Sequence, residues 1–136
     1  MDIGDKRIGV AISDQGGIIA SPMTIIDRTN LHQDIEAVVT LINQNEAEII
    51  VAGLPLTIDG TIGYQAEKVK YFTDNLAKNT NTPIVHRDES LTTLEARQLM
   101  QLTRKKKKRE KEKDDSIAAA FILQGYLDER KNKLDE

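Results

Sequence analysis

Residues 7–22 read RIGVAISDQGGIIASP, and this stretch predicts how the fold begins. Its first half, 7–13, is rich in β-branched residues and is typical of a strand. Asp-Gln-Gly-Gly at 14–17 has the composition of a tight turn, and a second apolar run follows at 18–22. Two extended runs joined by such a turn predict an antiparallel hairpin.

Apolar runs alternate with helical patterns after this hairpin. Apolar residues at 31, 35, 38, 39, 41 and 42 are spaced as on one face of a helix over 31–43, whereas EIIVAG at 48–53 is typical of a buried strand. The same criteria predict a loop at 54–60, a strand at 84–87, and helices at 64–78, 92–102 and 115–130. This order predicts one α/β domain over residues 1–136, with a mixed sheet, parallel later strands and helices on the faces of the sheet.

The composition excludes several classes of protein. The chain has 136 residues, 39% of them hydrophobic and 30% charged, which suits one folded domain. It contains no cysteine, so a disulfide framework, a thiolate zinc site and a cysteine nucleophile are excluded. No apolar run approaches the roughly 20 residues that span a bilayer, and no signal peptide is visible. We expect a cytoplasmic protein that has no contact with a membrane.

One segment concentrates the positive charge. Residues 104–113 read RKKKKREKEK, with eight basic and two acidic residues, although the whole chain has a net charge of −3. Clustered like charges repel, which predicts a solvated loop. Such a loop could hold a phosphate backbone without reading its sequence. The nucleic-acid-binding residues predicted here are Arg104, Lys105, Lys106, Lys107, Lys108 and Arg109.

Two acidic positions lie close to predicted strands. Asp2 is expected at the end of a short first strand, followed by a glycine and a turn, although a charge on a frayed chain end is the simpler interpretation. Glu89 follows the strand at 84–87, where open α/β sheets place their sites. The alternative for Glu89 is an acid that stabilises the start of the next helix, and Asp88 competes for the same role.

A third acidic position opens the last predicted helix. Asp114 and Asp115 stand where acids commonly cap a helix, and capping is the simpler interpretation. The three alanines at 118–120 would let this helix approach the sheet closely, which would bring an acid at its start near the strand ends.

Carboxylates from separate elements are the oxygen ligands that Mg²⁺ and Mn²⁺ prefer. Two such ions roughly 3.5–4 Å apart can activate a water and stabilise the leaving oxygen in phosphodiester hydrolysis. Asp2, Glu89 and Asp115 are therefore the candidate metal ligands and catalytic residues.

Two other features are weaker candidates. Gly53-Leu54-Pro55 follows a buried strand, with Gly60 and Gly63 close behind, and such a turn would let a substrate backbone approach. Ordinary loop structure explains it equally well. His32 and His86 could transfer protons, but a place at a helix start and one within a strand favour surface and structural roles.

Four motifs, in order and nearly end to end, resemble the YqgF family. They are DIGDKRIGVAISD at 2–14, IIVAGLPLTIDGT at 49–61, HRDESLTTLEAR at 86–97 and DDSIAAAFILQGYL at 114–127. The resemblance implies a ribonuclease H-like fold, with a mixed five-stranded sheet and helices on both faces. It also implies a Mg²⁺- or Mn²⁺-dependent nuclease whose acidic site maps to Asp2, Glu89 and Asp115. The basic run before the fourth motif resembles the family as well.

Several functions stay open at this point. The first hypothesis is a nuclease that processes the 5′ end of pre-16S rRNA in ribosome biogenesis. A Holliday junction resolvase would use the same chemistry, and it should be a two-fold dimer, whereas an RNA-processing enzyme can be a monomer or a homodimer. A non-catalytic nucleic-acid-binding module and one half of an actin-like ATPase are alternatives from other classes, although 136 residues supply only one of the two domains that such an ATPase needs.

The sequence departs from the family at two places. The family usually has arginine where Ser90 stands, and Lys6 or Arg7 could supply the missing phosphate contact. It also has several apolar residues before the first aspartate, where only Met1 stands here. Because a strand typically has about five or six residues, we expect a functional form with roughly four to six further apolar residues ahead of Asp2. The alternative is a strand that starts late.

Overall fold

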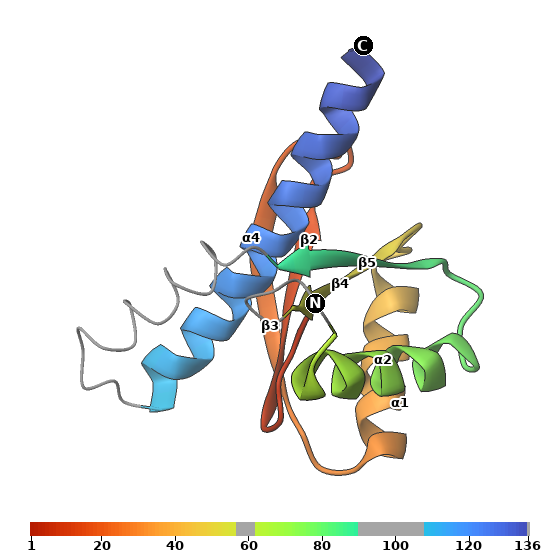
Figure 1. The fold of residues 1–136 in the computed structure, drawn as a ribbon, viewed down its shortest axis with the longest axis vertical. Coiled ribbons are helices and arrows are strands. Elements are labelled where there is room, and N and C mark those ends of the chain that lie inside the picture. The colour runs from red at the N-terminus through yellow and green to blue at the C-terminus, as the bar shows by residue number, and fades with distance from the viewer. Residues whose placement is uncertain (57–61, 90–107, 136) are drawn as a thin grey trace.

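The structure, a computed structural model, describes residues 1–56, 62–89 and 108–135, and the side chains of residues 89, 108–114, 134 and 135 lie outside this description. The predicted helix at 92–102 and residues 57–60 of the predicted loop also lie outside it. The described elements, in chain order, are β1 (Asp2–Ile3), β2 (Arg7–Ser13), β3 (Ala20–Asp27), α1 (Leu31–Gln44), β4 (Ile50–Pro55), α2 (Tyr64–Ala77), β5 (Ile84–Glu89) and α4 (Lys108–Asp135) (Figure 1).

The first three strands form an antiparallel sheet in the order β1-β2-β3. The predicted hairpin is confirmed, but its second strand begins at Ala20 and ends at Asp27, so the prediction of 18–22 is wrong. The reason is Asp14, whose Oδ1 accepts the backbone N–H groups of Ile18 and Ile19 at 2.7 and 3.1 Å. These hydrogen bonds lower the pKa of Asp14 and keep both isoleucines in the turn.

The other two described strands, β4 and β5, form a parallel pair, as predicted. Leu54 and Pro55, predicted as loop, belong to β4 because they continue its ladder with β5. The described residues form two sheets rather than the single five-stranded sheet that we expected. Within the described residues, Met1 links the two sheets: its amino group donates to Val51 O at 2.6 Å and its carbonyl accepts from Gly53 N at 3.1 Å. Two hydrogen bonds from one residue do not make a ladder.

Helices cover opposite faces of these sheets. On β2 the side chains alternate, so Ile8 and Val10 join the core beneath α1 and α2, while Gly9 faces α4. Figure 1 shows α1 and α2 together on one side, with α4 running along the β2–β3 hairpin. The most deeply buried core side chains include Ile8, Val38, Ala66, Val69, Phe72 and Leu76.

The last helix is longer than predicted. Residues 108–113 are helical and are not the solvated loop predicted for 104–113, and Asp115 lies inside α4 rather than at its start. Lysine, arginine and glutamate are good helix formers, and the two glutamates in the segment reduce the repulsion among its basic residues. Ala118 and Ala119 are buried against the sheet, as the close approach predicted from the alanines requires. None of the described helices is long and apolar enough to cross a membrane.

Candidate active site

A glycine on β2 lets α4 lie directly on the sheet. A Cβ atom at Gly9 would come within 2.5 Å of the carbonyl carbon of Asp115 and 3.1 Å of the backbone nitrogen of Ser116. Because side-chain carbons do not come so close to another backbone, only glycine permits this contact. Gly9 therefore sets where Asp115 lies.

Asp2 lies beside the same glycine. The two residues are register partners in the antiparallel β1–β2 pair. Side chains of directly opposed residues project from the same face of a sheet, so that of Asp2 is on the face that α4 covers. The fold thus brings Asp2 and Asp115, from the first and last described elements, to one place beside Gly9.

Asp115 is held by an arginine that the sequence did not link to it. Arg7 Nε donates to Asp115 Oδ2 at 2.7 Å, and the two side chains are only 21% and 25% exposed. Partial burial strengthens such a charge-assisted bond because less water competes for the charges. Arg7 stands two residues before Gly9 on β2 and therefore points to the same face. This alternation is the signal that could have linked Arg7 to the acidic site.

Glu89 is the last residue of β5 and pairs in register with Pro55 at the end of β4. Its backbone thus lies at the carboxyl end of the parallel pair, although the strand predicted at 84–87 ends too early, because Asp88 and Glu89 continue the ladder with β4. Its side chain, like that of Asp114, lies outside the description. Among the described side chains, no group of three or more metal-ligating residues gathers. The predicted three-carboxylate site therefore stays a prediction in which Glu89 is the third member.

A salt bridge joins α4 to β5. Arg87 Nη2 donates to Glu129 Oε1 at 2.9 Å. The guanidinium passes beside Gly125, where a Cβ atom would lie 2.5 Å from Arg87 Cζ. Arg87 stands two residues before Glu89, so the bridge joins the end of β5 to the second half of α4.

The predicted phosphate-binding residues fall partly within the description. Lys6 is exposed in the turn between β1 and β2, and its carbonyl accepts the backbone N–H of Arg28 at 2.9 Å. Lys108 and Arg109 lie in the first turn of α4, with their side chains outside the description, and residues 104–107 lie wholly outside it. A nucleic-acid-binding role for these residues stays a prediction.

The two histidines lie on other parts of the molecule. His86 Nε2 is 2.8 Å from Thr73 Oγ1, so its ring meets α2 on the sheet face opposite α4. Partial burial of the ring, and then the charge of Lys70, lower the pKa of His86. His32 is exposed on α1, with Nε2 3.1 Å from Glu36 Oε1. These contacts agree with the surface and structural roles that the sequence favoured.

Comparison with known proteins shows the family to which the chain belongs. The model of the family described as RuvX, Holliday junction resolvase, matches residues 1–129. The chain belongs to the RuvX family. A RuvX relative in Thermoanaerobacter pseudethanolicus, named "Putative pre-16S rRNA nuclease", is 44% identical over 137 residues, which cover 98% of this chain and 96% of the relative. A protein of the same name in Dehalococcoides mccartyi is 46% identical over 127 residues, covering 93% and 94% of the two chains.

A solved structure shares the fold of this RuvX chain. It is the crystal structure of the Fowlpox virus resolvase in complex with its substrate, Holliday junction DNA. The TM-score is 0.50, 94% of each chain is covered, and the sequences are 14% identical. At that identity the similarity concerns the fold alone, and the α/β class with mixed strands that the sequence predicted is confirmed.

Proposed function

We propose that this RuvX-family chain is a metal-dependent nuclease of the cytoplasm that hydrolyses phosphodiester bonds in the maturation of pre-16S rRNA. The observation that carries the proposal is the meeting of Asp2 and Asp115 beside Gly9. Two acids from distant parts of the chain, on a face that a helix covers, are poorly explained as caps or as charges on a frayed end. The names of the relatives support rRNA as the substrate.

Three carboxylates make up the proposed site. Asp2 and Asp115 offer oxygen donors from β1 and α4, and Glu89 would add a third from the end of β5. Carboxylate oxygens fit Mg²⁺ or Mn²⁺, and a bound divalent ion would supply an activated water and polarise the phosphodiester. Arg7, which holds one oxygen of Asp115, fixes the direction in which the other oxygen points.

A Holliday junction resolvase is the second candidate, and the description of the family favours it. Both functions need the same acids, so the substrate and the assembly distinguish them. A resolvase should cut a four-way junction symmetrically as a two-fold dimer, whereas rRNA processing requires neither property.

The test is incubation of the pure protein with a pre-16S rRNA fragment and with a four-way DNA junction, each with Mn²⁺ and with EDTA. We expect Mn²⁺-dependent cleavage of the RNA. Symmetric cleavage of the junction alone would favour the resolvase. Mn²⁺ titration should also show binding that Asp115→Asn weakens, and a protein that neither binds Mn²⁺ nor cuts either substrate would be a plain binding module.

The basic segment gives a separate prediction about affinity. Changing Lys105, Lys106, Lys107 and Lys108 to glutamine should weaken RNA binding and flatten its salt dependence. Each lost phosphate contact removes about 0.7 to 0.9 from the slope of log affinity against log salt concentration, because fewer counterions are released. Fluorescence anisotropy over a range of salt concentrations measures that slope.

A control for this experiment removes the same charge elsewhere. Lys78, Arg130, Lys131 and Lys133 are all exposed, and their change to glutamine subtracts four positive charges from other surfaces. This control should leave the slope close to that of the parent. Equal slopes for the two fourfold variants would mean that net charge, and not contact with this segment, governs binding.

A further inference from the structure

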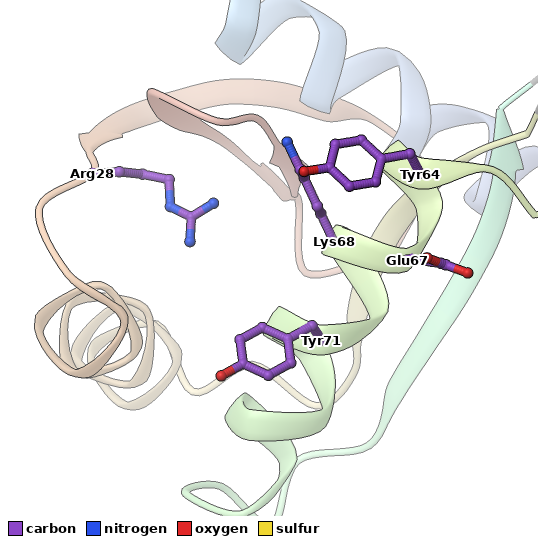
Figure 2. A pocket seen from close by; sticks show the side chains of 5 residues that line it. All are labelled: Arg28, Tyr64, Glu67, Lys68 and Tyr71. Atoms are coloured by element: carbon purple, nitrogen blue, oxygen red, sulfur yellow. The ribbon is translucent and has the colours of Figure 1, made fainter.

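A hollow of about 360 Å³ opens on the side of α2 that faces the β3–α1 connection. Its walls carry two tyrosines and two cations, Tyr64, Tyr71, Lys68 and Arg28, and Glu67 completes the lining. Figure 2 shows both phenol rings and Lys68 projecting from α2 toward the side where Arg28 lies, while Glu67 points the other way. The hollow is therefore aromatic and cationic along one wall.

The two tyrosines are presented to solvent. Tyr64 is 71% exposed and Tyr71 is 63% exposed, although aromatic residues make up only 4% of the chain. Seven residues separate them, which is two helical turns, so the rings stand about 10 Å apart along one face of α2. The core does not use them, because α2 buries Ala66, Val69 and Phe72 on its other side.

The two cations contact the turn between β1 and β2. Lys68 Nζ lies 3.1 Å from Asp5 Oδ1 and 4.3 Å from the centre of the Tyr64 ring. The hydrogen bond from Lys68 lowers the pKa of Asp5. Arg28 Nη1 donates to Gly4 O at 2.9 Å. Both cations thus attach to the turn that directly follows Asp2 and Ile3.

We propose that this surface, Tyr64 and Tyr71 with Lys68 and Arg28, binds an unpaired stretch of the nucleic-acid substrate by stacking bases on the two phenol rings. Single-stranded nucleic acid carries both π-faces for the tyrosines and anionic groups for the cations, and stacking tolerates any base. The surface lies on the α2 side of the sheet, and its two cations contact the turn that follows Asp2 and Ile3. The inference rests on the proposed nuclease function, which it deepens by naming the form of the substrate.

The two cations of this surface are already paired with carboxylates. Lys68 is paired with Asp5, and Arg28 is paired with the buried Asp34 at 3.1 Å, so both cations are largely compensated. Stacking, and not phosphate attraction, should therefore supply most of the affinity at this surface. Loss of the tyrosines should lower affinity without changing its salt dependence, in contrast to loss of the basic segment.

The experiment compares Tyr64→Ala, Tyr71→Ala and the matching Tyr→Phe variants, which keep the ring. Anisotropy in EDTA, where no cleavage occurs, measures binding to a blunt RNA duplex and to the same duplex with a single-stranded tail, with a DNA tail as a further arm. We expect each alanine variant to bind the tailed duplex about tenfold more weakly, with an unchanged salt slope and unchanged binding of the blunt duplex. The phenylalanine variants should bind like the parent. Phe121→Ala, which removes an aromatic ring of similar exposure from α4, is the control.

Three outcomes would overturn the inference. In the first, the alanine variants bind the tailed duplex as tightly as the parent. In the second, their affinity for the blunt duplex falls equally. In the third, the phenylalanine variants also lose affinity, which would indicate that the hydroxyl and not the ring makes the contact. Because binding is measured without metal, a protein that cuts nothing would refute the proposed nuclease and still report on this surface. Equal losses on RNA and DNA tails support stacking, whereas a loss confined to DNA would contradict the RNA substrate on which the inference rests.

Discussion

A Gly9→Ala variant should be less stable than the parent by about 2 to 3 kcal/mol, because the new methyl group overlaps backbone that has nowhere to move. The Cβ atom would meet the carbonyl group of Asp115, which is part of a helix packed along two strands. Either α4 shifts away from β2 or the strand bends, and both changes disturb buried contacts. Differential scanning calorimetry should show a drop in Tm on the order of 10 °C.

The same chain offers a matched control for this substitution. At Gly16, in the β2–β3 turn, a Cβ atom would meet only Ile18 and Asp14 side-chain atoms at 3.6 to 3.8 Å, which is ordinary contact. Gly16→Ala should therefore melt close to the parent. If the Tm of Gly9→Ala were also close to that of the parent, α4 would not lie on β2 at Asp115 as the structure has it.

Replacing Asp2 with asparagine should lower cleavage on the order of a hundredfold or more while the protein stays folded. Asparagine has nearly the same shape as aspartate, so the β1–β2 register is kept, but it carries no charge to hold a divalent ion. Single-turnover cleavage at saturating protein measures the loss, and the Tm checks the fold. Mn²⁺ affinity should fall in parallel, because the carboxylate is the proposed ligand.

Asp74→Asn makes the same chemical change on an exposed part of α2 and should retain the activity of the parent. Undiminished cleavage by Asp2→Asn, or by the parent in EDTA, would refute the proposed site. Equal losses in both aspartate variants would point to a general effect of charge on RNA binding.

The elements whose signal is local were predicted closely. The helices α1 and α2 begin at the predicted residues, because their apolar faces repeat at helical spacing over four turns. The predicted parallel pairing of β4 and β5 is also confirmed, since a helix between two strands leaves little alternative.

The predicted starts of β3 and α4 were wrong, because each start depends on a few local interactions. The start of β3 depends on the Asp14 carboxylate, which withdraws Ile18 and Ile19 from the strand despite their high β-propensity. The start of α4 depends on whether the basic segment is helical. Repulsion among its charges disfavours a helix, whereas the high helix propensity of its residues favours one. A pattern of residue types does not predict where either element begins.

The sequence by itself determined the α/β class and the family, and it named the acids proposed for the site, because motif spacing and hydrophobic periodicity are properties of neighbouring residues. Only the tertiary structure decided that Arg7 holds Asp115, its partner 108 residues away, and that both aspartates adjoin Gly9. A glycine in a strand pattern shows that no side chain is present, but not which backbone fills the space. That choice depends on the register of β1 with β2 and on the close approach of α4, which form together only when the chain packs.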